Sequence, residues 1–235
     1  MSPPWNLLAE RLFGSHHTIV ADGDFLSGTG CFDGQEVAVL GTTGHAEVGL
    51  ELALAQARQV LDIVERHPGR PILLLIDTQG QRLRRREELL GLNRAMAHLG
   101  KSIDFARRQG HPVLGLVYDQ ALSGGFITSG LIADACDALP DALIHVMGLP
   151  AMSRITKLPE AALRQLAQHN PVFAPGAENY VRMGGVRRLW HGDPVLALRQ
   201  ALADLSPHDE RALAGASRGG RRLAAEVMQR VLDAA

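Results

Sequence analysis

Residues 123–126, Ser-Gly-Gly-Phe, have the composition of a site that binds negative charge through the peptide backbone. The apolar run 113–118 predicts a buried strand before them, and the residues that follow predict a helix. The N–H groups of Gly124 and Gly125 would then be free donors of the first helical turn, at the positive end of the helix dipole. Such donors suit a phosphate or the oxyanion of a thioester enolate. A tight turn would need the same glycines, and we expect Ser123 to position the loop.

A second segment of this kind, residues 77–80 (Asp-Thr-Gln-Gly), follows the apolar run 72–76. Ligands of parallel α/β proteins collect at the carboxyl ends of the strands, so both segments are expected at one edge of the sheet. Thr78, Gln79 and Gly80 are therefore candidate substrate-binding residues, although a simple turn is an equal alternative.

A dense basic run lies just beyond this second segment, with arginines at positions 82, 84, 85 and 86. Arg84 and Arg85 are candidates for binding the phosphates of a coenzyme A-like arm, or an acidic carrier protein. Glu87 and Glu88 offset part of the charge, which makes a solvated helix start the simpler interpretation.

Ser123, His145 and Asp193 occur in the chain order of a Ser-His-Asp protease triad. His145 lies in an apolar run that predicts a strand, however, and Asp193 precedes a proline as a helix N-cap would. We therefore expect no serine nucleophile in this chain.

No metal site is expected from the spacing of histidines and cysteines. Cys31 and Cys136 are far apart, and the chain has neither a Cys-x-x-Cys nor a His-Glu-x-x-His pattern. His16, His17 and His45 have no spacing that suggests a shared ligand, so we interpret them as surface or turn residues. P-loop and Rossmann patterns are also absent, which excludes the usual nucleotide folds.

The elements expected to position these residues alternate between strands and helices. Apolar runs at 72–76, 113–118 and 142–146 predict strands that are buried on both faces, and helical periodicity appears at 46–66 and 87–108. This alternation predicts an α/β protein with a mainly parallel sheet.

The two ends of the chain carry smaller elements. Strands at 17–21 and 36–40 are expected to form a hairpin, and the glycine-rich stretch 22–34 between them has turn chemistry throughout. A short strand is expected at 186–189, and helices at 194–205 and 218–234 close the chain. Because no linker or internal repeat interrupts it, we expect residues 1–235 to form one domain.

Composition excludes several classes of protein. The 235 residues carry 24 basic and 25 acidic side chains, a net charge of −1, which removes the electrostatic argument for nucleic-acid binding. No apolar run approaches the roughly 18–20 residues that span a bilayer, and no signal peptide is evident. We expect a soluble, cytoplasmic chain without a membrane or nucleic-acid partner.

Three motifs resemble the carboxyltransferase branch of the crotonase superfamily. Residues 113–137 are similar to its strand, Ser-Gly-Gly loop and helix, and residues 77–80 resemble its Asp-Thr-Pro-Gly loop, with Gln79 in place of proline. Residues 177–186 resemble its closing helix and Gly-Val strand. The resemblance covers about residues 46–189, in order and at comparable spacing.

Within that branch, Leu-Val-Tyr-Asp followed by Ser-Gly-Gly-Phe at 116–126 is similar to the gamma subunit of biotin-independent malonate decarboxylase. The resemblance implies a crotonase-like fold, a ββα superhelix with a mainly parallel sheet and C-terminal helices. It implies an enzyme subunit that decarboxylates a malonyl thioester on an acyl-carrier protein to an acetyl thioester. Gly124 and Gly125 would stabilise the enolate oxygen.

The same resemblance implies partners and cofactors. The partners would be the beta subunit and the acyl-carrier protein, whose phosphopantetheine arm is coenzyme A-like. No biotin and no metal are expected, and the helices from Pro194 onward are candidates for the partner contact. Two alternatives remain: a carboxyltransferase subunit of a biotin-dependent acyl-CoA carboxylase, where the glycines would hold the biotin ureido oxygen, and a noncatalytic scaffold.

Overall fold

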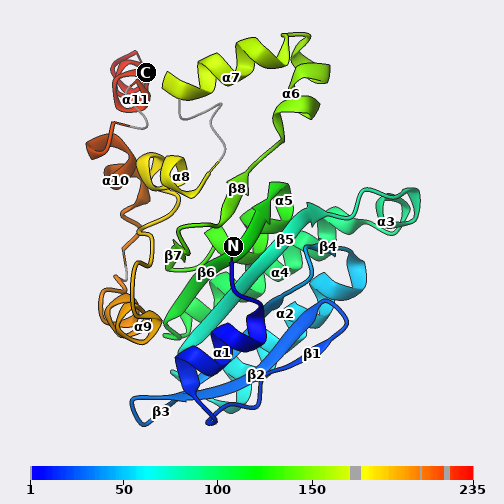
Figure 1. Cartoon of the computed structure of the whole chain (residues 1–235), viewed down its shortest axis with the longest axis vertical. Helices are drawn as coiled ribbons and strands as arrows, with labels where there is room; N and C mark the ends of the chain where they lie inside the picture. Colours follow the sequence, from blue (N-terminus) through cyan, green and yellow to red (C-terminus); the bar gives the residue numbers. More distant parts are fainter. Residues whose placement is uncertain (1, 170–175, 207, 220–222, 235) are drawn as a thin grey trace.

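The computed structural model describes residues 2–169, 176–206, 208–219 and 223–234, and within them a twisted mixed sheet forms the centre of the molecule (Figure 1). The sheet has the order β1-β2-β3-β5-β6-β7, with β4 paired to β5 and β8 paired to β6. Strands β1 to β3 are antiparallel, and the remaining pairs are parallel. The strands are β1 (Val20–Asp22), β2 (Phe25–Phe32), β3 (Gln35–Thr42), β4 (Ala46–Val48), β5 (Ile72–Gln81), β6 (Val113–Leu122), β7 (Ala135–Ala138) and β8 (Leu143–His145).

Helices cover both faces of this sheet and continue beyond its edge. They are α1 (Trp5–Phe13), α2 (Leu50–Arg66), α3 (Arg85–Leu89), α4 (Leu92–Arg108), α5 (Ser123–Phe126), the π-helical turn η1 (Ile127–Leu131), α6 (Leu149–Thr156), α7 (Glu160–His169), α8 (Ala177–Met183), α9 (Pro194–Ala203), α10 (Arg211–Ser217) and α11 (Ala224–Asp233). Among the described residues, no helix is long and apolar enough to cross a membrane.

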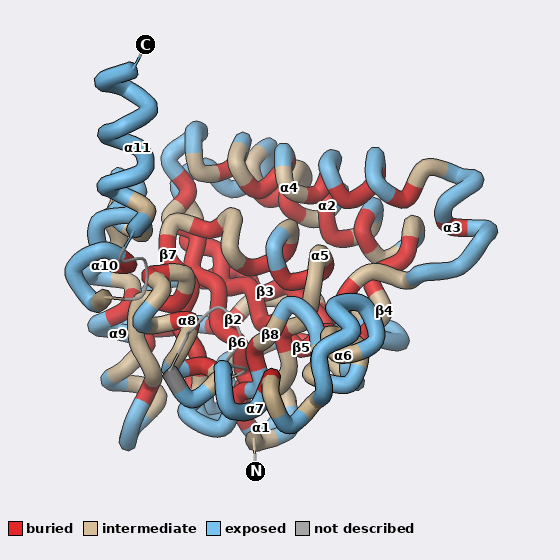
Figure 2. The backbone as a smooth tube through the Cα atoms, turned by 90° about the horizontal axis from the view of Figure 1, so that it is seen from above, coloured by how far each residue is buried: buried red, intermediate tan, exposed pale blue. Residues whose placement is uncertain are grey.

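The alternation of side chains along β5 explains why the sheet is buried on both faces (Figure 2). Leu73 and Leu75 belong to the core cluster that α1 and α9 cover, whereas Ile72 and Leu74 belong to the cluster beneath α2 and α4. Successive residues of a strand point to opposite faces, so an uninterrupted apolar run feeds both clusters. The prediction of a mainly parallel α/β sheet is confirmed.

The glycine-rich stretch 22–34 differs from its prediction, because most of it is the strand β2 rather than a series of turns. Its glycines permit close packing instead. A Cβ added at Gly28 would lie 2.6 Å from the Ile19 Cα, and one at Gly30 would lie 2.5 Å from the Phe13 ring. The hairpin turn itself is confined to Asp33 and Gly34, both at positive φ, so β2 rather than the segment 17–21 pairs with β3.

Several predicted boundaries also change. Strands β5 and β6 run past their predicted ends, because β4 and β8 supply hydrogen-bonding partners for their last residues. The predicted helix 87–108 divides at Gly91, whose φ of +81° ends α3 and starts α4. Strand β7 was not predicted, and the predicted strand 186–189 is reduced to a single bridge between Ala138 and Leu189. Part of the predicted helix 218–234, residues 220–222, lies outside the described residues.

Candidate active site

The two predicted glycine segments meet at the carboxyl ends of β5 and β6. A Cβ added at Gly125 would lie 2.9 Å from the Gly80 carbonyl carbon, and one at Gly80 would lie 3.0 Å from the Ser123 Cβ. Gly80 also has a φ of +107°, a conformation that favours glycine. The close approach of these backbones therefore requires glycine at 80 and at 125.

Gly124 occupies a different environment from Gly125. A Cβ at Gly124 would meet only the Gln81 side chain, 3.0 Å from its Oε1. The Gly124 N–H donates a hydrogen bond to this same Oε1 at 3.0 Å. The predicted oxyanion donor is thus engaged with an uncharged carbonyl-type oxygen of its own chain. Sequence reasoning missed Gln81, although its position directly after Gly80 places a long amide side chain beside the glycines.

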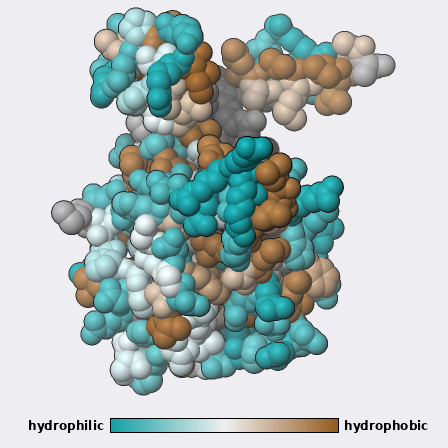
Figure 3. Space-filling view, turned by 90° about the vertical axis from the view of Figure 1, so that its right-hand side faces the viewer, coloured by the Kyte–Doolittle hydropathy of each residue, from teal (hydrophilic) through white to brown (hydrophobic). Residues whose placement is uncertain are grey.

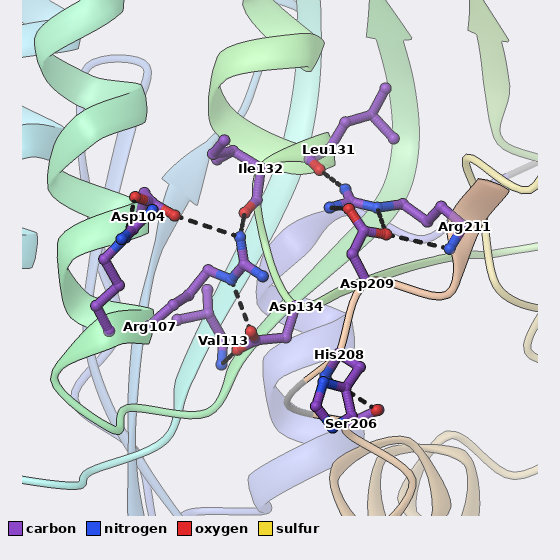
Figure 4. Close-up of polar contacts among 11 residues, drawn as sticks. Asp104, Arg107, Val113, Leu131, Ile132, Asp134, Ser206, His208, Asp209 and Arg211 are labelled. Carbon is purple, nitrogen blue, oxygen red and sulfur yellow. Dashed lines mark hydrogen bonds and ion pairs between the residues drawn. The ribbon is translucent and has the colours of Figure 1, made fainter. Parts of the chain in front are cut away.

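The helical segment that begins at these glycines is held at its other end by two arginines (Figure 4). Arg107 of α4 donates to the carbonyl oxygen of Ile132 at 2.9 Å and to Asp134 at 2.6 Å. Arg211 of α10 donates to the carbonyl oxygen of Leu131. Cations at the carboxyl end of a helix complement its dipole and satisfy its last carbonyls, so α4 and α10 help to fix the helix whose entrance carries the glycines.

Ser123 supports the loop. Its backbone φ is +52°, and its Oγ donates to the Val146 carbonyl oxygen at 2.6 Å. His145 Nδ1 is buried and has no hydrogen-bond partner within the described part of the chain. Asp193 accepts the Val195 N–H as the N-cap of α9. The described geometry of these side chains forms no Ser-His-Asp triad, in agreement with the sequence interpretation.

Thr78 and Gln79, in the second glycine segment, differ in their exposure to solvent. Thr78 is fully buried, and its Oγ1 donates to the Ala46 carbonyl oxygen at 2.7 Å while accepting the Gly80 N–H at 3.0 Å. This is the turn-stabilising role that the sequence left open. Gln79 is exposed, so of the two side chains only that of Gln79 is accessible to a ligand.

The arginine run is largely paired with glutamates that are distant in the sequence. Arg84 donates to Glu47 at 2.9 Å, and Arg86 donates to Glu51 at 2.6 Å. Glu87 is buried and accepts the Leu50 N–H at the start of α2. These contacts favour a structural role for most of the run, whereas Arg85 is exposed at the start of α3 and remains a candidate for binding an anion.

A polar cluster that was not predicted lies where β5 and β6 approach their carboxyl ends. His45, from the β3–β4 connection, places its Nε2 3.0 Å from Asp119 Oδ2 and 3.7 Å from Asp77 Oδ1. The His45 N–H also donates to Asp77 Oδ2 at 2.9 Å. Burial raises the pKa of Asp77, and the hydrogen bond from His45 opposes this shift. Since the three residues come from separate elements, no local spacing in the sequence could reveal them.

The mainly parallel sheet, with a glycine-lined helix entrance at its carboxyl edge, has the crotonase-like fold that is found in carboxyltransferases. The structure of transcarboxylase 12S with hydrolysed methylmalonyl-coenzyme A shares this fold, with a TM-score of 0.71 at 18% identity over 84% of this chain and 40% of that one. A malonate decarboxylase gamma subunit model matches residues 43–235, and the chain belongs to that family. It is therefore a subunit of an enzyme complex, as predicted.

Individual relatives agree with this assignment. The chain is 34% identical over 206 residues, 77% of this chain and 70% of the relative, to the malonyl-S-ACP:biotin-protein carboxyltransferase MADD of Malonomonas rubra. It matches a chain of the Pseudomonas malonate decarboxylase hetero-tetramer in complex with coenzyme A, with a TM-score of 0.79 and 26% identity over 95% and 97% of the two chains. The Pseudomonas MdcD-MdcE hetero-dimer matches with a TM-score of 0.75 and 29% identity over 96% of both chains.

Proposed function

We propose that this chain stabilises the enolate oxygen that forms when a malonyl thioester on an acyl-carrier protein loses carbon dioxide. The N–H groups of Gly124 and Gly125 are the proposed donors. The observation that carries this proposal is the hydrogen bond from the Gly124 N–H to the carbonyl-type oxygen of Gln81 at 3.0 Å. An N–H that already binds such an oxygen is oriented to bind the oxygen of a thioester.

In the proposed reaction, the bond between the carboxylate carbon and the α-carbon breaks. Its electron pair moves into the thioester, where negative charge develops on the oxygen and at the α-carbon. A proton then adds to the α-carbon and yields the acetyl thioester. Removal of one hydrogen-bond donor to such an oxygen typically costs about 2.7–4 kcal/mol in other enzymes. The substrate oxygen would replace the oxygen of Gln81 and would itself accept the hydrogen bond.

We propose that the beta subunit binds near the helices that stand away from the sheet, α6, α7 and α11. Relatives of this chain occur in a hetero-dimer with MdcD. Ile155 and Leu166 are exposed on α6 and α7, and Figure 3 shows apolar side chains along the projecting α11, where Val231 and Leu232 are exposed. Helix α9 is a poorer candidate than the sequence suggested, because its Leu198 packs into the chain's own core.

A carboxyltransferase that uses a biotin protein is the second candidate function. The name of the Malonomonas relative includes a biotin protein as acceptor, which favours this alternative. The same glycines would then hold the ureido oxygen of biotin. The two functions differ in the fate of the carboxyl group, which is released as carbon dioxide in one and retained on biotin in the other.

The test uses the complex of this chain with its beta subunit and acyl-carrier protein, after biotinylated protein has been removed on avidin. We expect carbon dioxide release from the malonyl thioester to persist. Gly124→Val should reduce it about 100-fold or more while the complex stays assembled, because the branched side chain would keep the thioester oxygen away from the N–H, which is equivalent to the loss of one donor. The three atoms nearest to an added Cβ all belong to the flexible Gln81 side chain, so we expect the variant to fold. Unchanged turnover in the assembled variant would indicate a scaffold, and dependence on biotin would favour the second function.

A further inference from the structure

We propose that His45, Asp77 and Asp119 bind a divalent transition-metal ion of the Zn²⁺ type. Each residue offers one ligand atom, and these atoms lie within 4.8 Å of one another. One imidazole nitrogen with two carboxylate oxygens is a ligand set that suits Zn²⁺, with water completing the coordination shell. The proposal concerns a site separate from the glycine donors and does not depend on their role.

The buried position of Asp77 distinguishes this cluster from an ordinary surface ion pair. Asp77 is 3% exposed, and its Oδ1 has no hydrogen-bond partner among the described residues. This oxygen points toward the imidazole of His45, 3.7 Å from its Nε2. A buried carboxylate oxygen without a hydrogen-bond partner is costly, because the imidazole 3.7 Å away replaces only part of its lost hydration. A cation between Asp77, Asp119 and His45 would satisfy it.

The remaining contacts hold the ligands in place. The other oxygen of Asp77 accepts the His45 N–H at 2.9 Å, which fixes the carboxylate against the β3–β4 connection. The Asp77 N–H in turn donates to the Thr42 Oγ1 at 3.2 Å. Asp119 is half-exposed, so an ion can enter from solvent and keep water ligands on that side. Hydrogen bonds of this kind around the ligands are typical of protein metal sites.

We expect the bound ion to stabilise the fold by connecting three elements. The ion would link the β3–β4 connection to β5, which contains Gly80, and to β6, which leads into Gly124 of α5. A metal ion that binds the native state and not the unfolded chain stabilises the protein, and the stabilisation grows with the logarithm of the free ion concentration relative to its Kd. The bound complex should therefore resist thermal unfolding better than the complex treated with a chelator.

The test compares metal content and thermal stability in the complete decarboxylase complex. The complex is stripped with a chelator, titrated with ZnCl₂ by calorimetry, and analysed for bound zinc after dialysis. The variants are His45→Gln, Asp77→Asn and Asp119→Asn. Asp22→Asn and His98→Gln serve as matched controls, because both residues are exposed and lie outside the cluster.

We expect each of the three variants to bind one zinc ion per gamma chain fewer than the wild type, or to bind it about tenfold more weakly. Added zinc should raise the Tm of the wild type and of the controls more than that of the variants. Equal zinc content in the wild type and all three variants would overturn the proposal. If only His45→Gln retains the ion, the proposed ligand set of one imidazole and two carboxylates is wrong. If Asp77→Asn fails to fold, Asp119→Asn still tests the carboxylate ligands.

Discussion

The side-chain oxygen Oε1 of Gln81 accepts a hydrogen bond from the backbone N–H of Gly124 at 3.0 Å. This contact joins the last residue of β5 to the first turn of the helix that follows β6. In this structure Gln81 therefore occupies the Gly124 N–H, which we propose as a donor to the substrate oxygen. Substrate binding would therefore exchange one hydrogen bond for another, and the amide of Gln81 would compete with the thioester.

Removing this competition should tighten substrate binding. For Gln81→Ala we expect the KM for the malonyl thioester to fall about 2- to 10-fold, the equivalent of a hydrogen bond of about 0.5–1.5 kcal/mol, with little change in kcat. Steady-state kinetics of the assembled complex measure both constants. Gln109→Ala, at the exposed C-cap of α4, is the control. A higher KM together with a lower kcat would instead assign Gln81 a direct role in binding.

The two glycines should differ in their tolerance of a methyl group. In Gly125→Ala, the added Cβ would lie 2.9 Å from backbone atoms of Gly80, so we expect destabilisation of about 1–3 kcal/mol. In Gly124→Ala, only the flexible Gln81 side chain must move. A thermal melt should show a Tm lower by several degrees for Gly125→Ala alone. Equal melting temperatures for the two variants would contradict the packing argument.

The sequence predicted the parts of the site that depend on local pattern. The apolar run 113–118 followed by Ser-Gly-Gly identified the strand and the glycine helix entrance, because both signals occupy consecutive residues. The contacts between elements could not be predicted in the same way. His45 and Asp119 are 74 residues apart, and the pairing of Gly124 with Gln81 spans 43 residues. Residues that are so far apart in the sequence come into contact only because β5 and β6 lie side by side in the sheet.

The same limit explains the errors in secondary structure. The sequence predicts turns at Gly28 and Gly30, but both residues lie in β2, which is extended because β3 pairs with it along its whole length. Glycine indicates that the backbone bends or that another group comes close, and the sequence alone does not separate these uses. The close packing of Phe13 against Gly30 is a property of the folded sheet and helix together.

Ser123 should affect stability more than catalysis. Ser123→Ala removes the hydrogen bond from Oγ to the Val146 carbonyl oxygen, which we expect to cost about 1 kcal/mol, whereas decarboxylation should fall only modestly. Chemical denaturation and the carbon dioxide assay measure the two effects. Ser123→Gly is the informative comparison, because glycine relieves the positive φ while losing the same hydrogen bond. Loss of all turnover in Ser123→Ala would point to a nucleophile.

The two candidate anion-binding arginines should respond differently to charge reversal. Arg85→Glu is expected to weaken binding of the acidic carrier protein and to reduce its salt dependence, because Arg85 is exposed at the start of α3. Arg84→Glu would also disrupt the ion pair with Glu47, so its effect should be partly structural. Carrier affinity measured at low and high salt separates these effects. If both variants bind the carrier as the wild type does, the arginine run is a solvated surface.

His145 should make the stability of the chain sensitive to mild acid. Burial lowers the pKa of His145, so the folded state disfavours the protonated imidazole. The unfolded chain takes up the proton near its ordinary pKa of about 6.5, and the stabilising contribution that is present above this pH is lost as the pH falls toward and through the folded pKa. We expect the Tm of the wild type to decrease more between pH 7.5 and pH 5.5 than that of His145→Asn. His98→Asn, which alters an exposed histidine on α4, should keep the wild-type dependence. An unchanged pH dependence in His145→Asn would show that its imidazole is hydrated in the folded chain.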